Sequence, residues 1–169
     1  TPEGAPAARP SPAARPAASS SPASFPKIDA GTQKSRDDLR RKVLQDELAR
    51  IVSDTGIRLV GPNSIGTVSI DPAMALTANA AFAVDELRPG NWAVVSQSGS
   101  LIGALLSRAD ARGLGFSRLI SVGNEVDLAG GEIADLLVDD PKTKAILLFM
   151  ETLRDGERLA RAARRAHEA

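Results

Sequence analysis

The amino-acid sequence predicts an α/β fold, in which a parallel β-sheet is flanked by helices. Three consecutive units fill residues 91–168, and in each unit a short apolar run is followed by a helical pattern. Two of the apolar runs, at 116–123 and 144–151, have nearly continuous apolar centres, as expected for strands that are covered on both faces. Strands that alternate with helices favour parallel pairing through right-handed crossovers.

The composition is typical of a folded domain without a charge bias. Of the 169 residues, 43% are hydrophobic and 25% are charged, which indicates a globular core. Basic and acidic residues both number 21, so nothing indicates a nucleic-acid or membrane partner. The absence of cysteine excludes disulfides and thiolate metal sites, and we predict no metal site. No apolar run reaches the roughly 18 residues of a membrane-spanning helix, and no secretory signal is visible, so we expect a cytoplasmic protein.

The N-terminal residues 1–34 are predicted to form a disordered linker. Residues 1–26 consist almost entirely of Ala, Pro and Ser, and they hold seven of the 11 prolines. Such a segment cannot bury enough apolar surface to offset the conformational entropy that it would lose on folding. We therefore expect the folded part to begin close to residue 35.

A helix is predicted from Ser35, which can serve as its N-cap, to a stop at Gly56. Apolar residues recur along it at helical spacing: Leu39, Val43, Leu44, Leu48, Ile51 and Val52. The stretch "IRLVG" at 57–61 then favours a short strand. Residues 72–90 show little periodicity and are predicted to be mostly loop with one short extended piece, and "RPG" marks a turn before the first of the three units.

The three units divide into alternating strands and helices. Gly113 closes the first helix and Pro141 stops the second. Strands are predicted at 91–96, 116–123 and 144–151, and helices at 101–111, around 133–138 and at 156–168.

Polar residues collect where the three predicted strands end. Ser96, Gln97, Ser98, Gly99 and Ser100 follow the first strand. Gly123, Asn124 and Asp127 follow the second, and Glu151 ends the third. Because the carboxyl ends of parallel strands meet at one edge of a sheet, where open α/β sheets bind ligands, we expect these residues to lie together.

The serine cluster at 96–100 has three interpretations. A helix N-terminus carries unpaired N–H groups and a partial positive charge, so small residues and hydroxyl donors there suit a phosphate. Alternatively, Ser98 is simply the N-cap of the following helix. As a third possibility, Ser98 is a nucleophile on a sharp turn with His167 downstream as its base, although the strict G-x-S-x-G pattern of such turns is absent.

Charged side chains near the C-terminus allow two interpretations. Glu151 is either a surface carboxylate or a functional acid that holds a cationic or imidazole partner in place. The arginines of the last helix are most simply a solvated face: Arg158, Arg161, Arg164 and Arg165.

Four motifs together resemble the NDP-forming acyl-CoA synthetases, which include the ADP-forming acetate–CoA ligases and the alpha subunit of succinyl-CoA synthetase. The motifs are "GIRLVGPNSIG", "VVSQSGSLIGALL", "SVGNEVD" and "DDPKTKAILLFME", and they occur in that family's order and spacing. The resemblance covers residues 36–169. It implies a flavodoxin-like (succinyl-CoA synthetase-like) domain at 61–169, preceded at 35–60 by the last helix and strand of a truncated CoA-binding domain.

The resemblance also implies an activity and its site residues. Such enzymes interconvert acyl-CoA, ADP and phosphate with the free acid, CoA and ATP through a phosphohistidine. Ser98, Gly99 and Ser100, together with Ser96, match the turn that holds the phosphate. Glu151 matches the carboxylate that orients the histidine. The residues expected near CoA are Asn63, Ser64 and Asn124. The implied cofactors are coenzyme A, and ADP or ATP with Mg²⁺ on other domains.

The sequence departs from the family pattern at both ends of the resemblance. The Gly-rich CoA-binding unit is expected before residue 36, where the Pro/Ala-rich segment stands, and the phosphorylated histidine is expected beyond the last helix. We therefore expect the chain to act with the remaining synthetase domains or with a beta-type ATP-grasp subunit. The alternative is a non-catalytic module that senses CoA or another ligand in a protein lysine acetyltransferase, or a degenerate remnant.

Overall fold

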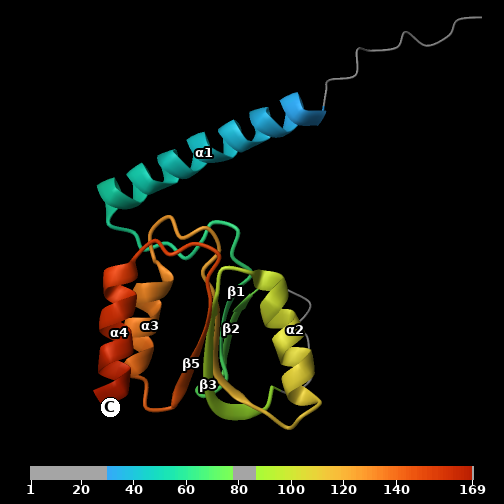
Figure 1. Cartoon of the computed structure of the whole chain (residues 1–169), viewed down its shortest axis with the longest axis vertical. Coiled ribbons are helices and arrows are strands. Elements are labelled where there is room, and N and C mark those ends of the chain that lie inside the picture. Colours follow the sequence, from blue (N-terminus) through green and yellow to red (C-terminus); the bar gives the residue numbers. More distant parts are fainter. Residues whose placement is uncertain (1–29, 78–86, 169) are drawn as a thin grey trace, which may run out of the picture.

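The computed structural model describes residues 30–77 and 87–168 (Figure 1). The predicted linker lies outside these residues as far as residue 29, whereas its last part, 30–34, belongs to a helix. The predicted loop at 72–90 also lies partly outside them. Within the described residues, one sheet with helices on both faces confirms the predicted fold class (Figure 1).

The five-stranded sheet has a parallel centre and an antiparallel side. Its strands are β1 (Gly66–Ser69), β2 (Met74–Thr77), β3 (Pro89–Ser96), β4 (Phe116–Ser121) and β5 (Ala145–Phe149), in the order β2-β1-β4-β3-β5. β3 pairs in parallel with β4 and with β5. β1 pairs antiparallel with β4 and with β2. The sheet is therefore mixed, and the β1–β2 hairpin extends the parallel strands that the sequence predicts.

The helices that connect the parallel strands cover opposite faces of the sheet (Figure 1). α2 (Gly99–Asp110) covers one face, and α3 (Gly130–Val138) and α4 (Gly156–Glu168) cover the other. All three confirm predicted helices, with starts shifted by up to three residues. The crossover through α2 leads from β3 to β4, and the crossover through α3 leads from β4 past β3 to β5. Strand order therefore reverses between β3 and β5.

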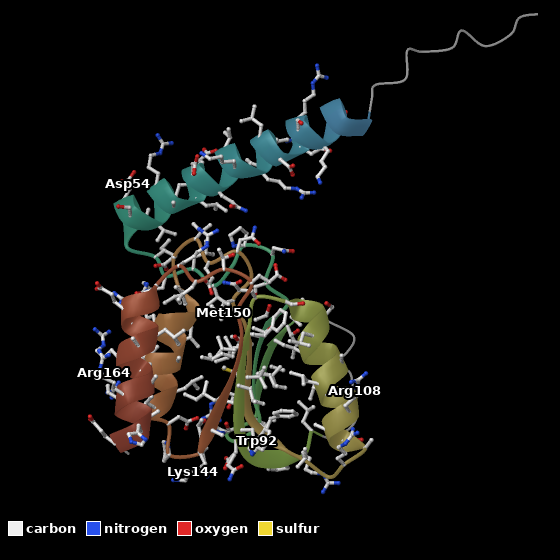
Figure 2. All side chains as sticks on the ribbon, in the orientation of Figure 1. Asp54, Trp92, Arg108, Lys144, Met150 and Arg164 are labelled. Carbon is white, nitrogen blue, oxygen red and sulfur yellow. The ribbon has the colours of Figure 1, made fainter. Side chains whose placement is uncertain are left out.

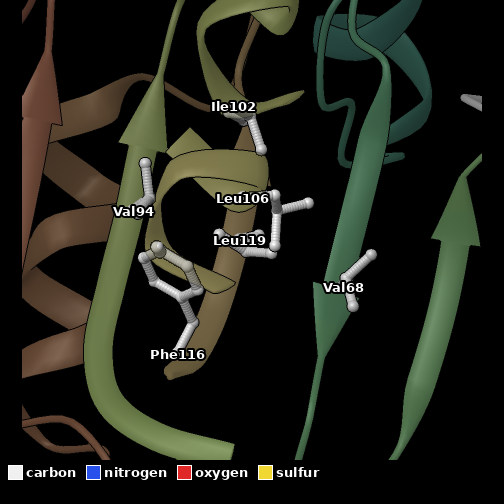
Figure 3. Close-up of a cluster of buried hydrophobic side chains, with 7 residues drawn as sticks. Val68, Val94, Ile102, Leu106, Phe116 and Leu119 are labelled. Atoms are coloured by element: carbon white, nitrogen blue, oxygen red, sulfur yellow. The ribbon is translucent and has the colours of Figure 1, made fainter. Parts of the chain in front are cut away.

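Side-chain alternation along β3 divides the core into two clusters, one under each helix layer. Val94 points into the cluster shared with α2, whose buried members are Val68, Val94, Ile102, Leu106, Ala109, Phe116 and Leu119 (Figure 3). Its neighbours Ala93 and Val95 point to the opposite face, where they join Ile120, Val122, Ile133 and Leu137. Both faces of β3 are thus covered along its buried second half, which agrees with the consecutive apolar residues 92–95.

The first helix, α1 (Ala30–Thr55), is longer than predicted and lies across one end of the domain (Figure 1). Ser35 does not cap it, because Ser35 is inside the helix and its Oγ donates to the Gly31 carbonyl at 3.0 Å. The predicted stop is confirmed: Gly56 has a positive φ of 69°, and its N–H donates to the Val52 carbonyl. The apolar stripe of α1 is mostly exposed at Leu39, Val43, Leu44 and Ile51.

The strand predicted at 57–61 is wrong. This segment is extended but pairs with the loop after β4 instead of with another strand. The Leu59 N–H donates to Asp127 Oδ2 at 2.6 Å, and the Leu59 carbonyl accepts from Leu128 at 3.1 Å. The Gly61 carbonyl accepts from Val126 at 2.9 Å. The apolar pattern of the segment is compatible with a strand, but its hydrogen-bond partners belong to a loop.

Candidate functional site

A polar cavity of about 420 Å³ lies at the carboxyl ends of β3 and β5, where the strand order reverses. Open α/β sheets bind ligands at this kind of switch point. The cavity is lined by Gln45 of α1, by Asn63 and Ile65, by Gln97, Ser98, Gly99 and Ser100, by Gly123 and Asn124, and by Glu151, Thr152 and Arg154. We call it the phosphate cavity.

Six of the eight predicted site residues line the phosphate cavity: Asn63, Ser98, Gly99, Ser100, Asn124 and Glu151. They come from three separate strand ends and from the segment before β1. Asn63 and Asn124 meet directly, because Asn63 Nδ2 donates to Asn124 Oδ1 at 3.4 Å. The expectation that the strand ends converge is therefore confirmed.

The other two predicted residues, Ser96 and Ser64, do not line the cavity but hydrogen-bond to the backbone next to it. Ser96 is fully buried; its Oγ accepts from the Ser98 N–H at 3.0 Å and donates to the Ser98 carbonyl at 2.8 Å. Ser64 Oγ donates to the Ser121 carbonyl at 2.6 Å and accepts from the Gly66 N–H. Because their hydroxyls are already engaged with the backbone, both serines shape the turns that carry the cavity residues.

The first turn of α2 is not capped by a side chain. Ser98 occupies the N-cap position in an extended conformation, with φ −95° and ψ 111°, but makes no side-chain hydrogen bond to the helix backbone. Its Oγ instead lies 3.1 Å from Ser100 Oγ. Ser98 is therefore the N-cap residue by position, but its hydroxyl does not cap the helix. The N–H groups of the first turn remain available at the cavity, and with two hydroxyls beside them they form a set of donors suited to an anion.

Two glycines are required by close packing beneath the cavity. A Cβ on Gly99 would overlap Ile65 Cγ2 and lie 3.2 Å from Ile65 Cγ1, so the start of α2 can approach Ile65 only without a side chain. Gly123 has φ 59°, and a Cβ there would overlap the Pro62 carbonyl oxygen. The Asn124 N–H donates to that same oxygen at 2.8 Å. Both glycines thus hold the segment before β1 against the turns of the cavity.

Gln97 positions the backbone that follows β5, a contact that the sequence does not indicate. Its Oε1 accepts from the N–H groups of Glu151 and Thr152 at 2.7 and 3.0 Å. Its Nε2 donates to the Thr152 carbonyl at 2.7 Å. The side chain therefore continues the β3–β5 pairing beyond the last strand residue and fixes the backbone of Glu151. A glutamine next to a strand end carries no signal for such a contact, because its partners are 54 and 55 residues away.

Two opposite charges in the phosphate cavity have no partner within the described residues. The carboxylate of Glu151 and the guanidinium of Arg154 are both exposed, and neither makes a side-chain hydrogen bond or an ion pair there. Among the described residues, they are the only charged side chains that line this cavity. A free carboxylate at this position can accept an N–H from an imidazole, and a free guanidinium can bind an oxyanion.

A second cavity of about 630 Å³ adjoins the same loop, and Arg154 lines it too. Here most of the charged side chains are paired: Arg58 binds Asp127 at 3.1 Å and Glu132 at 2.8 Å, and Arg158 binds Glu132. Burial raises the pKa of Asp127, but hydrogen bonds from the Leu59 amide and Arg58 more than offset this effect and hold the pKa below its usual range. Asp127, which the sequence placed at the ligand edge, is thus a structural ion-pair partner.

Glu125 is the most deeply buried acid of the second cavity, with 5% of its surface exposed. Its Oε1 accepts from the Gly130 N–H at 3.0 Å, while its Oε2 has no hydrogen-bond partner. The sequence reasoning did not identify this residue. A glutamate inside "SVGNEVD" gives no indication that the turn, at φ 53°, directs its carboxylate inward.

The nucleophile interpretation of Ser98 finds no support in the geometry. His167 is exposed near the C-terminal end of α4, and the phosphate cavity is lined by the loop that precedes that helix. Figure 2 shows the two ends of the sheet: Met150, just after β5, lies towards one end, and Trp92, in β3, lies towards the other. The arginines of α4 are only partly a solvated face, since Arg161 and Arg165 pair with Asp135.

The described residues contain no cluster of three or more histidine, aspartate or glutamate side chains that could hold a metal ion. Among the described helices, none is long and apolar enough to cross a membrane.

Comparisons with known proteins point to one family. A family model described as "Succinyl-CoA ligase like flavodoxin domain" matches residues 89–169. The chain is 36% identical over 121 residues to acetate–CoA ligase (ADP-forming) I of Archaeoglobus fulgidus, covering 72% of this chain and 17% of that protein. It is 35% identical over 123 residues to the alpha subunit of acetate–CoA ligase (ADP-forming) I of Pyrococcus furiosus, covering 73% of this chain and 26% of that subunit.

Solved structures give the same result. Acetyl-coenzyme A synthetase 1 of Ca. Korarchaeum cryptofilum, described as dinucleotide forming and in complex with phosphate and ADP, matches with a TM-score of 0.65 and 30% identity. That match covers 73% of this chain and 26% of the synthetase chain. The apo form of the same synthetase matches with a TM-score of 0.68. The chain thus spans a minor part of the relatives that it matches.

Proposed function

We propose, from the premise that residues 89–169 belong to the family of succinyl-CoA ligase like flavodoxin domains and that the chain's homologues are ADP-forming acetate–CoA ligases, that this protein is the phosphate-holding part of an NDP-forming acyl-CoA synthetase. The reaction is the interconversion of acyl-CoA, ADP and phosphate with the free acid, CoA and ATP. The observation that carries the proposal is the uncapped first turn of α2, which faces the same cavity as the free carboxylate of Glu151.

The donors at the start of α2 would hold the phosphoryl group. The backbone N–H groups of Gly99 and Ser100 and the hydroxyls of Ser98 and Ser100 offer hydrogen bonds to phosphoryl oxygens, and the partial positive charge of the helix N-terminus favours a negative group. Since these donors are fixed by the Ser96 hydrogen bonds and by the contact of Gly99 with Ile65, they need little reorganisation when charge develops.

Glu151 would orient the histidine that carries the phosphoryl group. A carboxylate that accepts the N–H of one imidazole nitrogen fixes the ring tautomer, so the other nitrogen is free to attack phosphorus. The charge on Glu151 also stabilises the imidazolium character that develops as the N–P bond forms. Since His167 does not line the cavity, this proposal requires a histidine from another domain or from a partner subunit with an ATP-grasp fold.

Coenzyme A would reach the phosphate cavity with its thioester end only. Asn63 and Asn124 contribute amide groups to the cavity lining, and Ser64 anchors the backbone next to Asn63 through its hydrogen bond to Ser121. These residues fit a polar thioester or acyl phosphate but offer nothing that recognises adenine. We expect the remainder of CoA and the Mg²⁺–nucleotide to be bound by other domains, and the protein to work in the cytoplasm, where both are available.

Binding of inorganic phosphate to the chain tests the proposed site. In a ¹⁵N–¹H NMR titration, the amides of Gly99 and Ser100 should show the largest shifts and should saturate together. Ser100→Ala should raise the Kd by about 2- to 12-fold, as expected for one lost hydrogen bond. The matched control is Ser107→Ala, which removes an exposed serine hydroxyl near the other end of α2 and should leave the Kd unchanged. Small, unsaturated shifts spread over the whole domain would contradict the proposal.

A further inference from the structure

We propose that Arg154 is the cationic phosphate-binding residue of this site, reaching from the β5–α4 loop to the oxyanion held at the start of α2. This inference rests on the proposed function and adds to it a residue that neither the motifs nor the turn after β3 identify. Three observations lead to it: the charge of the cavity, the missing partner of Arg154 and the anchoring of its backbone. Glu125 offers Arg154 a competing role, which the test separates from this one.

Arg154 is the one positively charged side chain that the described part of the chain contributes to the phosphate cavity. Its lining consists of hydroxyl, amide and small residues with two charged exceptions, Glu151 and Arg154. Phosphate carries between one and two negative charges near neutral pH, and it would sit in the same cavity as the Glu151 carboxylate. The partial charge of one helix N-terminus is about half an elementary charge, which cannot balance both anions. A guanidinium in the same cavity adds one full positive charge and so removes much of this imbalance.

Arg154 is free to take this role, whereas its neighbours are not. Three arginines line the two adjoining cavities: Arg58, Arg154 and Arg158. Arg58 and Arg158 are held in ion pairs with Asp127, Glu132 and Asp155. Within residues 30–77 and 87–168, Arg154 has neither an ion pair nor a hydrogen bond to its guanidinium. A guanidinium offers five donors in a planar fork, which suits bidentate binding of a phosphate.

The backbone on both sides of Arg154 is anchored. Gln97 binds both the N–H and the carbonyl of Thr152, two residues before it. On the other side, the Asp155 carboxylate accepts from the Arg158 N–H at 3.2 Å, and the Asp155 carbonyl accepts from Leu159. The loop therefore fixes the backbone on both sides of Arg154, while none of the described residues holds its exposed guanidinium, which leaves that group available to a ligand in the phosphate cavity.

Glu125 offers Arg154 one other partner. Its Oε2 is buried without a hydrogen bond, and both residues line the second cavity. If Arg154 served only to neutralise this acid, its role would be structural, and removing the charge of Glu125 would have the same effect as removing that of Arg154. The two roles can be separated, because Glu125 does not line the phosphate cavity.

The test is the affinity of the folded chain for inorganic phosphate, measured by the same amide titration at fixed ionic strength. Arg154→Gln should raise the Kd by about 10- to 100-fold, as expected for a lost charge-assisted contact, and Arg154→Lys should fall between wild type and Arg154→Gln. Arg164→Gln is the matched control, since Arg164 is exposed on α4 and points away from the sheet (Figure 2). Arg164→Gln and Glu125→Gln should keep the Kd within twofold of wild type.

Different outcomes overturn different claims. If the amides of Gly99 and Ser100 respond to phosphate in the wild-type chain but Arg154→Gln leaves the Kd within twofold, the inference about Arg154 is wrong and the proposed site stands. If Glu125→Gln weakens binding as much as Arg154→Gln does, Arg154 acts through the buried acid and the inference is also wrong. If those amides do not respond in the wild-type chain, the proposed function and the inference are both wrong.

Discussion

Replacing Gly99 by alanine tests whether the phosphate cavity depends on the close contact between α2 and Ile65. The added Cβ would overlap Ile65 Cγ2, closer than Cβ atoms approach other atoms in proteins, and would lie 3.2 Å from Cγ1. Relieving such an overlap costs about 1–3 kcal/mol. The higher helix propensity of alanine returns at most about 1 kcal/mol, and less at a helix end. We expect Gly99→Ala to lower the free energy of unfolding by about 1–2 kcal/mol.

The overlap between a Cβ at position 99 and Ile65 Cγ2 can also be relieved by shortening Ile65. Ile65→Ala deletes Cγ2, whereas Ile65→Val keeps it and serves as the matched control. In a double-mutant cycle, Gly99→Ala and Ile65→Ala should couple favourably by about 1–2 kcal/mol, and Gly99→Ala and Ile65→Val should be nearly additive. Urea unfolding can be followed through Trp92, the single tryptophan of the chain. Wild-type stability in Gly99→Ala, or additivity with Ile65→Ala, would refute the packing argument.

Three further predictions concern residues around the site. Gln97→Glu keeps the oxygen that accepts from the Glu151 N–H but places a second oxygen against the Thr152 carbonyl. It should therefore lower the free energy of unfolding in urea by about 1–3 kcal/mol. Unchanged stability would mean that the Gln97 contacts are not formed in solution. Glu125→Gln removes the charge of a buried carboxylate whose Oε2 has no hydrogen-bond partner. It should therefore raise the free energy of unfolding by about 1 kcal/mol, and a loss of stability would contradict this account. The pKa of Asp127 is lowered in the folded state, so the ionised side chain stabilises the fold fully above its ordinary pKa of 3.8, and this contribution is lost as the pH falls through the lower folded pKa. Asp127→Asn should therefore flatten the acid side of a profile of unfolding free energy against pH. An unaltered profile would exclude Asp127 as a contributor.

Most of the parallel part of the fold is predictable from local sequence. The three strand–helix units match because apolar runs set β3, β4 and β5, and Gly113 and Pro141 punctuate the helices between them. The antiparallel hairpin was not predicted, since β1 and β2 are four residues each, and β1 joins the sheet by pairing with β4, about 50 residues away. The stretch 57–61 has the composition of a strand, but its partner is a loop, which no local pattern reveals.

The candidate site divides in the same way. The rule that parallel strands end at one edge places Ser98, Gly99, Ser100 and Glu151 together, and they do line one cavity. The roles of Gln97, Arg154 and Glu125 were not predictable, because each depends on contacts across the fold or on the lack of them.

The reason for Gly99 also differs from what its sequence context suggests. A glycine in a serine-rich turn indicates room for an anion. In the structure, however, the missing side chain makes room for Ile65, and the anion would instead meet the backbone N–H group.

The most direct test of the central claim is the rate of phosphohistidine formation in the assembled synthetase that contains this chain. With ³²P-labelled ATP and rapid quench, Glu151→Gln should slow labelling of the histidine on the order of 100-fold while leaving the fold intact, because the neutral amide no longer fixes the imidazole tautomer or stabilises its developing charge. Glu157→Gln, which neutralises an exposed acid in the first turn of α4, should label at the wild-type rate. Equal labelling rates for wild type and Glu151→Gln would remove Glu151 from phosphoryl transfer and contradict the account.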